Sequence, residues 1–261
     1  MENEIIKNTI RVGNSAGVLL PKSWLNSRVK VILEPLNVEK DVLDILNEEN
    51  LLKDTLGAYL VGSYARKEET IDSDVDILVI TNNTDKTIRK GRYDLLLVSK
   101  KEVERQLTKN ILPILAMIKE GKTIINESLR KNYINNQLTR MNLKWHIETT
   151  KSAMKVVEEF IKLAEENKEK VRDAAAYSLI LRLRTLYIID CLKKDKLWKK
   201  QEFLGLIEKI SGSLIAYERY LESKNRDTKE NKLPTEEARR LMDYINKKTK
   251  EIEKWLKEAK S

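Results

Sequence analysis

The sequence predicts an α+β fold in three parts: a small β-hairpin unit, a mixed β-sheet with helices, and an α-helical bundle. Three observations predict it. Apolar residues alternate with polar ones around Gly/Asn turns near the start of the chain, and five of the eight glycines lie before residue 92. Beyond them, apolar residues recur at spacings of three and four. We place the parts at residues 1–36, 37–126 and 127–261.

Composition excludes several classes of protein. Apolar residues make up 41% of the 261 residues, which is enough for a packed core. The single cysteine, Cys191, excludes a disulfide scaffold and a Cys-based zinc site, and the single histidine, His146, excludes mechanisms that need two. No apolar run approaches the ~18–20 residues of a membrane span, and the start lacks a signal peptide. We therefore expect a soluble, cytoplasmic protein with no membrane partner.

Charge is distributed unevenly along this basic chain, whose formal net charge is +9. Residues 41–120 contain 12 basic and 15 acidic residues, whereas residues 121–261 contain 32 and 22. The acidic middle indicates a unit that uses carboxylates. The basic C-terminal part fits an anionic partner such as RNA, and equally a solvated surface.

The first part has the pattern of short strands joined by tight turns. Apolar side chains alternate with polar ones or cluster at residues 9–12, 18–22 and 28–33, and a Gly/Asn turn is expected at 13–17. About 35 residues bury too little surface to be stable alone, so we expect this unit to pack on its neighbour or on a second copy, as a homodimer.

The stretch from Arg11 to Lys22, Arg-Val-Gly-Asn-Ser-Ala-Gly-Val-Leu-Leu-Pro-Lys, resembles the AbrB/SpoVT swapped-hairpin family. The resemblance covers residues 5–34 and implies a dimer that exchanges strands. It also implies that Arg11, Lys22 and Arg28 contact DNA. A dimerisation hairpin with solvated basic residues remains the alternative.

The middle part places three carboxylates at the ends of apolar strands. A strand at 58–61 runs directly into Gly62-Ser63, and Asp74-Val75-Asp76 opens the apolar run 75–80. Side chains alternate faces along a strand, so Asp74 and Asp76 share one face. Asp94 stands near the start of another apolar strand, and the three carboxylates converge if the two strands are neighbours.

Such a group of carboxylates predicts a divalent cation beside a polyphosphate. Ionised aspartates and a nucleoside triphosphate repel each other unless Mg²⁺ lies between them, held by carboxylate and phosphate oxygens. A Gly-Ser turn lets main-chain N–H groups approach a phosphate closely. Arg66 adds positive charge on the phosphate side. Two ions would stabilise both the attacking and the leaving oxygen of an in-line displacement.

The pattern Gly62-Ser63, ten residues, Asp74-Val75-Asp76, then Asp94 on a later strand resembles the DNA polymerase β nucleotidyltransferase superfamily. Residues 45–126 are most similar to its minimal nucleotidyltransferases. The resemblance implies that Asp74, Asp76 and Asp94 are catalytic and hold Mg²⁺, and that Asp94 also activates an acceptor hydroxyl. It implies that Gly62, Ser63 and Arg66 bind the triphosphate. The next position is commonly Gly in the family and is Lys67 here.

The rest of the chain is predicted to be helical. A helix over 101–119 starts at Ser99 and kinks at Pro113, and four to five helices follow it as a bundle. Arg140 and His146 have the spacing of the Arg and His in HEPN ribonucleases, although packing is the favoured role for His146. The basic residues around Arg184 could line a cleft, although a solvated face is the favoured role for them.

Two functions follow as hypotheses. The first is Mg²⁺-dependent transfer of NMP from an NTP, ATP being the first candidate, to a hydroxyl of a small molecule, a protein or an RNA end. The alternative is a DNA-binding or antitoxin-like regulatory module whose nucleotidyltransferase domain modifies or senses a partner.

Overall fold

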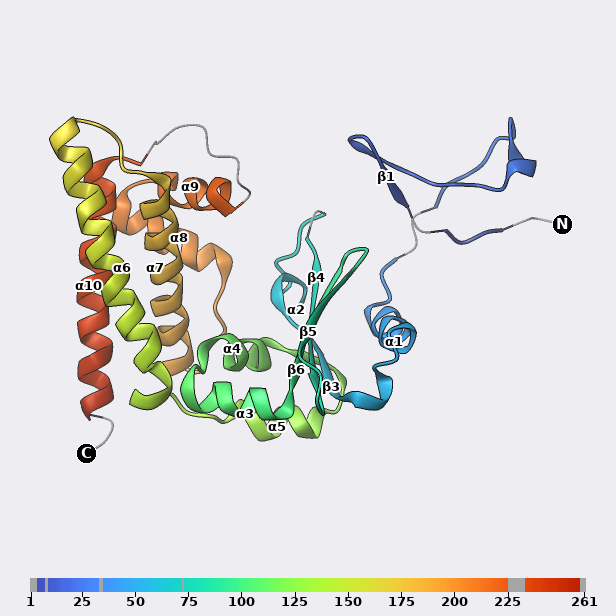
Figure 1. The fold of residues 1–261 in the computed structure, drawn as a ribbon, viewed down its shortest axis with the longest axis horizontal. Helices are drawn as coiled ribbons and strands as arrows, with labels where there is room; N and C mark the ends of the chain where they lie inside the picture. The colour runs from blue at the N-terminus through green and yellow to red at the C-terminus, as the bar shows by residue number, and fades with distance from the viewer. Residues whose placement is uncertain (1–3, 8, 33–34, 72, 225–232, 259–261) are drawn as a thin grey trace. The chain divides into compact units, whose positions relative to one another are not determined.

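The computed structural model describes most of the chain, namely residues 4–7, 9–32, 35–71, 73–224 and 233–258 (Figure 1). Contacts between residues divide it into two units, Met1–Asn37 and Val38–Ser261. The sheet and the helical bundle therefore belong to one unit, and the boundary predicted at residue 126 stays a prediction.

The first unit contains a short antiparallel hairpin, β1 (Ile10–Val12) and β2 (Ser15–Gly17). Gly13 makes the turn with φ +59°, a conformation that glycine adopts without a steric penalty. Two of the three predicted strands are wrong. The partner of β1 is residues 15–17, inside the predicted turn, instead of 18–22, and the described residues 28–32 form no strand. Alternation alone does not make a strand when no neighbouring strand supplies its hydrogen bonds.

The second unit is built on a five-stranded mixed sheet in the order β5-β6-β4-β3-β7. Its central pair, β4 and β6, is parallel, and every other pair is antiparallel. The strands are β3 (Thr55–Leu60), β4 (Val75–Thr81), β5 (Lys86–Lys90), β6 (Tyr93–Ser99) and β7 (Lys122–Ile125).

Helices cover both faces of this sheet. On one face, Ile77 and Val79 of β4 pack with Leu46 of α1 (Val38–Glu48). On the other face, Leu78 and Ile80 join the core that contains α3 (Lys100–Lys109) and α4 (Leu112–Glu120). This two-sided burial explains the nearly continuous apolar run of β4. Asp76 has the same parity as Leu78, so it starts on the face covered by α3 and α4.

The helix predicted over 101–119 is two helices. Ser99 caps α3 as expected, because its side chain accepts the N–H of Glu102. Pro113 lies in the first turn of α4, where its missing N–H costs nothing. The chain therefore breaks before Pro113 instead of kinking at it.

The remaining helices, apart from the first, form the predicted bundle; that first helix, α5, packs on α4, β3 and β7. The long helices α6, α7 and α10 pack against one another, and α8 and α9 complete the group (Figure 1). The helices are α5 (Glu127–Ile134), α6 (Arg140–Asn167), α7 (Asp173–Lys193), α8 (Lys200–Ser211), α9 (Ile215–Lys224) and α10 (Thr235–Glu258). The predicted α+β class is confirmed. Among the described helices, none has the length and apolar character needed to cross a membrane.

Candidate active site

Two of the three predicted carboxylates stand side by side at the start of the central strands. Asp76 of β4 is the direct register partner of Asp94 of β6. Neighbouring strands lie about 4.8 Å apart, and paired residues of parallel strands point to the same face. The structure therefore brings Asp76 and Asp94 together, and the parallel pairing is what does so.

Asp74 lies just outside the strand, two residues before Asp76, and it is exposed. Arg92 holds the loop that leads to it. The guanidinium of Arg92 donates to the carbonyl oxygens of Ile71 and Ser73, at 2.9 and 3.1 Å, and its own carbonyl accepts the N–H of Val75 at 2.7 Å. The charge of Asp74 is close enough to raise the pKa of Asp76, but Asp74 is not among the residues that line the cavity beside Asp76 and Asp94.

Gly62 connects β3 to the short helix α2 (Gly62–Arg66) in a conformation that excludes other residues. Its φ is +70°, and a Cβ at this position would lie 2.1 Å from Oδ2 of Asp76. The main chain of Gly62 and the carboxylate of Asp76 are therefore in direct proximity. Lys67, the departure from the family pattern, also adopts a left-handed φ of +59°, so the turn keeps the conformation that glycine favours.

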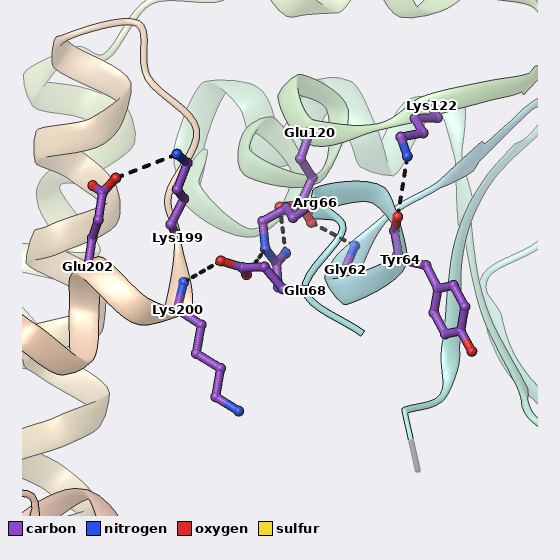
Figure 2. A network of polar contacts seen from close by, with 9 residues as sticks. All are labelled: Gly62, Tyr64, Arg66, Glu68, Glu120, Lys122, Lys199, Lys200 and Glu202. Atoms are coloured by element: carbon purple, nitrogen blue, oxygen red, sulfur yellow. Dashed lines mark hydrogen bonds and ion pairs between the residues drawn. The ribbon is translucent and has the colours of Figure 1, made fainter. Parts of the chain in front are cut away.

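Arg66 is the centre of a buried polar network (Figure 2). Its Nη1 donates to Oε2 of Glu120 at 2.7 Å, and its Nε donates to Oε2 of Glu68 at 2.9 Å. The other oxygen of Glu120 accepts the N–H of Gly62 at 2.8 Å. The side chains of Arg66 and Glu120 are only 9% and 5% exposed, so these are strong charge-assisted bonds.

Trp198, in the loop before α8, brings the bundle to this network. The guanidinium carbon of Arg66 lies 4.1 Å from the Trp198 ring centroid, and that of Arg184 on α7 lies 4.8 Å from it. These are cation–π distances. Glu68 adds a second link, because its Oε1 accepts the main-chain N–H of Lys200 at 2.9 Å (Figure 2).

A cleft of about 670 Å³ opens between the sheet and the bundle at this point. Asp76, Asp94, Gly62, Ser63 and Arg66 all line it, so five of the predicted site residues share one cavity. The other polar and aromatic residues that line it are Thr87, Arg89, Glu120, His146, Arg184, Thr185 and Trp198. The remaining lining is apolar and comes mainly from α4 and α7.

The acidic side of the cleft is short of positive charge. Burial raises the pKa of Asp76, and the negative charges of Asp94, Asp74 and Glu120 raise it further, while Arg66 lowers it. Arg89 offsets part of this charge, since its Nε lies 3.2 Å from Oδ2 of Asp94. Mg²⁺ prefers hard oxygen ligands such as carboxylates, and the carboxylates of this cleft are not fully neutralised by neighbouring cations. The residues fit the ion, although the described side chains hold no ready-made group of three ligands.

Sequence reasoning missed three contributors to this cleft. Glu120, Trp198 and Arg89 belong to elements that no local pattern connects with the Gly-Ser turn or the aspartates. Glu120, for example, is 58 positions from Gly62 along the chain. Arg184 was expected on a solvated face, and its contact with Trp198 instead places it in the lining of the cleft.

The three basic residues predicted to contact DNA belong to the other unit. Lys22 and Arg28 are exposed, and the side chain of Arg11 lies outside the described part of the structure. The residues that line the cleft all belong to the second unit.

Comparison with known proteins identifies the family. The profile of the nucleotidyltransferase domain family matches residues 39–260. The chain belongs to this family. The nucleotidyltransferase is thus a transferase enzyme, as the Gly-Ser and aspartate pattern predicted, and the matched region includes both the sheet and the bundle. No curated protein matches the sequence significantly.

Two solved structures are similar to the nucleotidyltransferase. One is a nucleotidyltransferase-like protein from Exiguobacterium sibiricum, at 17% identity and TM-score 0.38, covering 82% of this chain and 75% of that one. The other is spectinomycin adenyltransferase AAD(9) from Enterococcus faecialis with ATP and spectinomycin, at 14% identity and TM-score 0.40, covering 81% and 98%.

Replacement of Gly62 tests the geometry of the turn. We expect Gly62→Ala to lower the free energy of unfolding by about 2 kcal/mol, because it forces a non-glycine residue to positive φ and displaces the Asp76 carboxylate. Gly205→Ala is the matched control, since Gly205 lies inside α8 and a Cβ there would meet no atom within 4 Å. We expect this control to raise the free energy of unfolding, measured with urea, by about 0.5–1 kcal/mol. Equal effects of the two changes would contradict the assignment.

The single histidine predicts a pH dependence of stability. His146 is 6% exposed, and burial together with the charge of Arg182 lowers the pKa of His146 from 6.5 to about 4. The unfolded chain therefore takes up the proton first. Stability is unaffected by this group above pH ~6.5 and falls as pH decreases toward 4, by about 3 kcal/mol in all.

Urea unfolding between pH 7.5 and 4 measures this loss, and His146→Gln should remove it. Because the chain has one histidine, its imidazole NMR signal reads the same titration directly. A midpoint near pH 6.5 in the folded protein would contradict the buried, neutral state.

Proposed function

We propose that this protein transfers NMP from an NTP, with ATP as the first candidate, to a hydroxyl of an acceptor bound in the cleft, in a Mg²⁺-dependent reaction. The observation that carries the proposal is the register pairing of Asp76 with Asp94, directly beside the main chain of Gly62. Two adjacent carboxylates against a Gly-Ser turn suit a site for a metal-bound triphosphate.

Each residue has a proposed role. Asp74, Asp76 and Asp94 would hold the divalent ions, which supply charge neutralisation to the triphosphate when bound. Gly62 and Ser63 would bind the triphosphate through close main-chain and hydroxyl donors. Arg66 would assist them from the other end of α2, where its guanidinium borders the same cleft.

The reaction needs one proton acceptor. The acceptor hydroxyl oxygen bonds to the α-phosphorus, the bond from that phosphorus to pyrophosphate breaks, and the hydroxyl proton leaves. Asp94 is the proposed recipient, because it lines the cleft on β6 and keeps an oxygen beside the one that Arg89 contacts. Arg89 would then restrict how Asp94 turns toward the acceptor.

Removal of one carboxylate tests the proposal. We expect Asp76→Asn to lower pyrophosphate release from labelled ATP and Mg²⁺ by at least about 10²-fold, since the site would lose one of the carboxylates proposed to hold the ion. Asp85→Asn is the control, because Asp85 bonds Ser99 at the far end of β6. The assay uses a panel of small hydroxyl compounds, protein fractions and RNA as acceptors. Unchanged pyrophosphate release in Asp76→Asn would contradict the proposal.

The first unit suggests self-association. Its large apolar side chains are mostly exposed, and a hairpin of two three-residue strands is marginal alone. The exposed ones are Ile5, Ile6, Ile10, Val12, Leu19, Leu20, Leu25, Val29, Val31, Ile32 and Leu36. We propose that this unit pairs with a second copy, and that contact of Arg11, Lys22 and Arg28 with DNA, the regulatory alternative, depends on that pairing.

Sedimentation of the full chain tests the pairing. We expect a dimer, and we expect Val12→Asp combined with Val31→Asp to yield a monomer with unchanged thermal unfolding of residues 38–261, because both side chains are exposed in the single chain. Met141→Asp is the control, since Met141 is a similarly exposed apolar residue of the bundle. A wild-type monomer at micromolar concentration would contradict the proposal.

A further inference from the structure

Glu120 occupies the donors that a phosphate group would use. One of its oxygens accepts the N–H of Gly62 at 2.8 Å, and the other accepts Nη1 of Arg66 at 2.7 Å (Figure 2). A main-chain N–H beside a guanidinium is a typical donor pair for a phosphate. In this structure an internal carboxylate fills both positions.

Because these charged groups are buried, Glu120 can leave Arg66 and Gly62 only if another anion takes its place. The side chains of Glu120 and Arg66 are 5% and 9% exposed, and a buried charge that loses its partner is strongly destabilising. A phosphate can replace Glu120 as the partner of Arg66 and Gly62. Glu120 would then face a second anion in a pocket that already holds Asp76 and Asp94, so it has to turn away.

We propose that Glu120 is an internal competitor for the triphosphate site, and that nucleotide binding displaces its carboxylate from Gly62 and Arg66. This inference rests on the proposed function. It assigns to Glu120 a positioning role that holds the phosphate donors in place while no nucleotide is bound and lowers the affinity for the triphosphate.

The displacement reaches the helical bundle through Arg66. The guanidinium of Arg66 lies over Trp198, which also contacts Arg184, and Glu68 joins Arg66 to the main chain of Lys200 at the start of α8. When Arg66 changes its anionic partner, the environment of the Trp198 ring changes with it. Triphosphate binding would therefore change the contacts of the Trp198 loop, which borders the cleft on the side of the bundle.

The Glu120→Gln variant distinguishes competition with the triphosphate from structural support of Gly62 and Arg66. Glutamine keeps an oxygen that accepts the N–H of Gly62 and removes the competing charge. We expect Mg²⁺ with inorganic tripolyphosphate, and Mg²⁺ with ATP, to bind the variant about tenfold more tightly in calorimetry. Glu127→Gln is the matched control, because it removes the same charge from an ion pair with Arg130 outside the cleft, and its affinity should equal that of the wild type.

Unchanged or weaker binding in Glu120→Gln, with wild-type binding intact, would overturn this inference alone. Absence of binding to the wild type would contradict the proposed function and this inference together.

A second measurement does not depend on that variant folding. Tripolyphosphate with Mg²⁺ should change the tryptophan fluorescence of the wild type, and Trp198→Phe should abolish the change while the other tryptophans remain. A change that persists in Trp198→Phe, or no change at saturating tripolyphosphate, would contradict displacement at Arg66.

Discussion

The pairing of β4 with β6 in parallel is the constraint on which the rest of the site depends. It places Asp76 opposite Asp94 at the start of two strands whose other residues are mostly buried and apolar. Two carboxylates so placed repel each other, and burial raises the pKa of Asp76. The fold maintains this repulsion because the apolar core beneath fixes the register, since a shift by one residue would turn every buried side chain to the wrong face. The stability of the sheet thus holds in place a site that favours cations.

Arg66 supplies a buried positive charge to the same cleft. Arg66 is held between Glu68 and Glu120 and lies over Trp198, so α2, α4 and the start of α8 meet at one guanidinium. This network adds a polar link to the apolar core that the sheet and the bundle already share. The acidic and basic sides of the cleft come from different elements, which explains why the net charge of the whole chain says little about the site.

Local pattern was enough for the residues that belong to one strand or turn. The apolar run 75–80 and the Gly-Ser turn predicted Gly62, Asp74 and Asp76 in positions that the structure brings to one end of the sheet, with Asp94 beside them. The strand β5 was missed because its sequence, Lys-Thr-Ile-Arg-Lys, is that of an exposed edge strand with little apolar content. Glu120 and Trp198 were missed for a different reason: their roles arise from packing between segments far apart in sequence. The strand expected at 28–33 shows the converse: the pattern alternates, but residues 28–32 form no strand in the described part of the chain.

The most direct test of the proposed site is a crystal structure of the full chain grown with Mg²⁺ and a non-hydrolysable ATP analogue. We expect metal density in contact with both Asp76 and Asp94, and phosphate oxygens against the main chain of Gly62 and Ser63. Nucleotide bound elsewhere in the chain, or metal that touches neither aspartate, would contradict the assignment of this cleft as the active site.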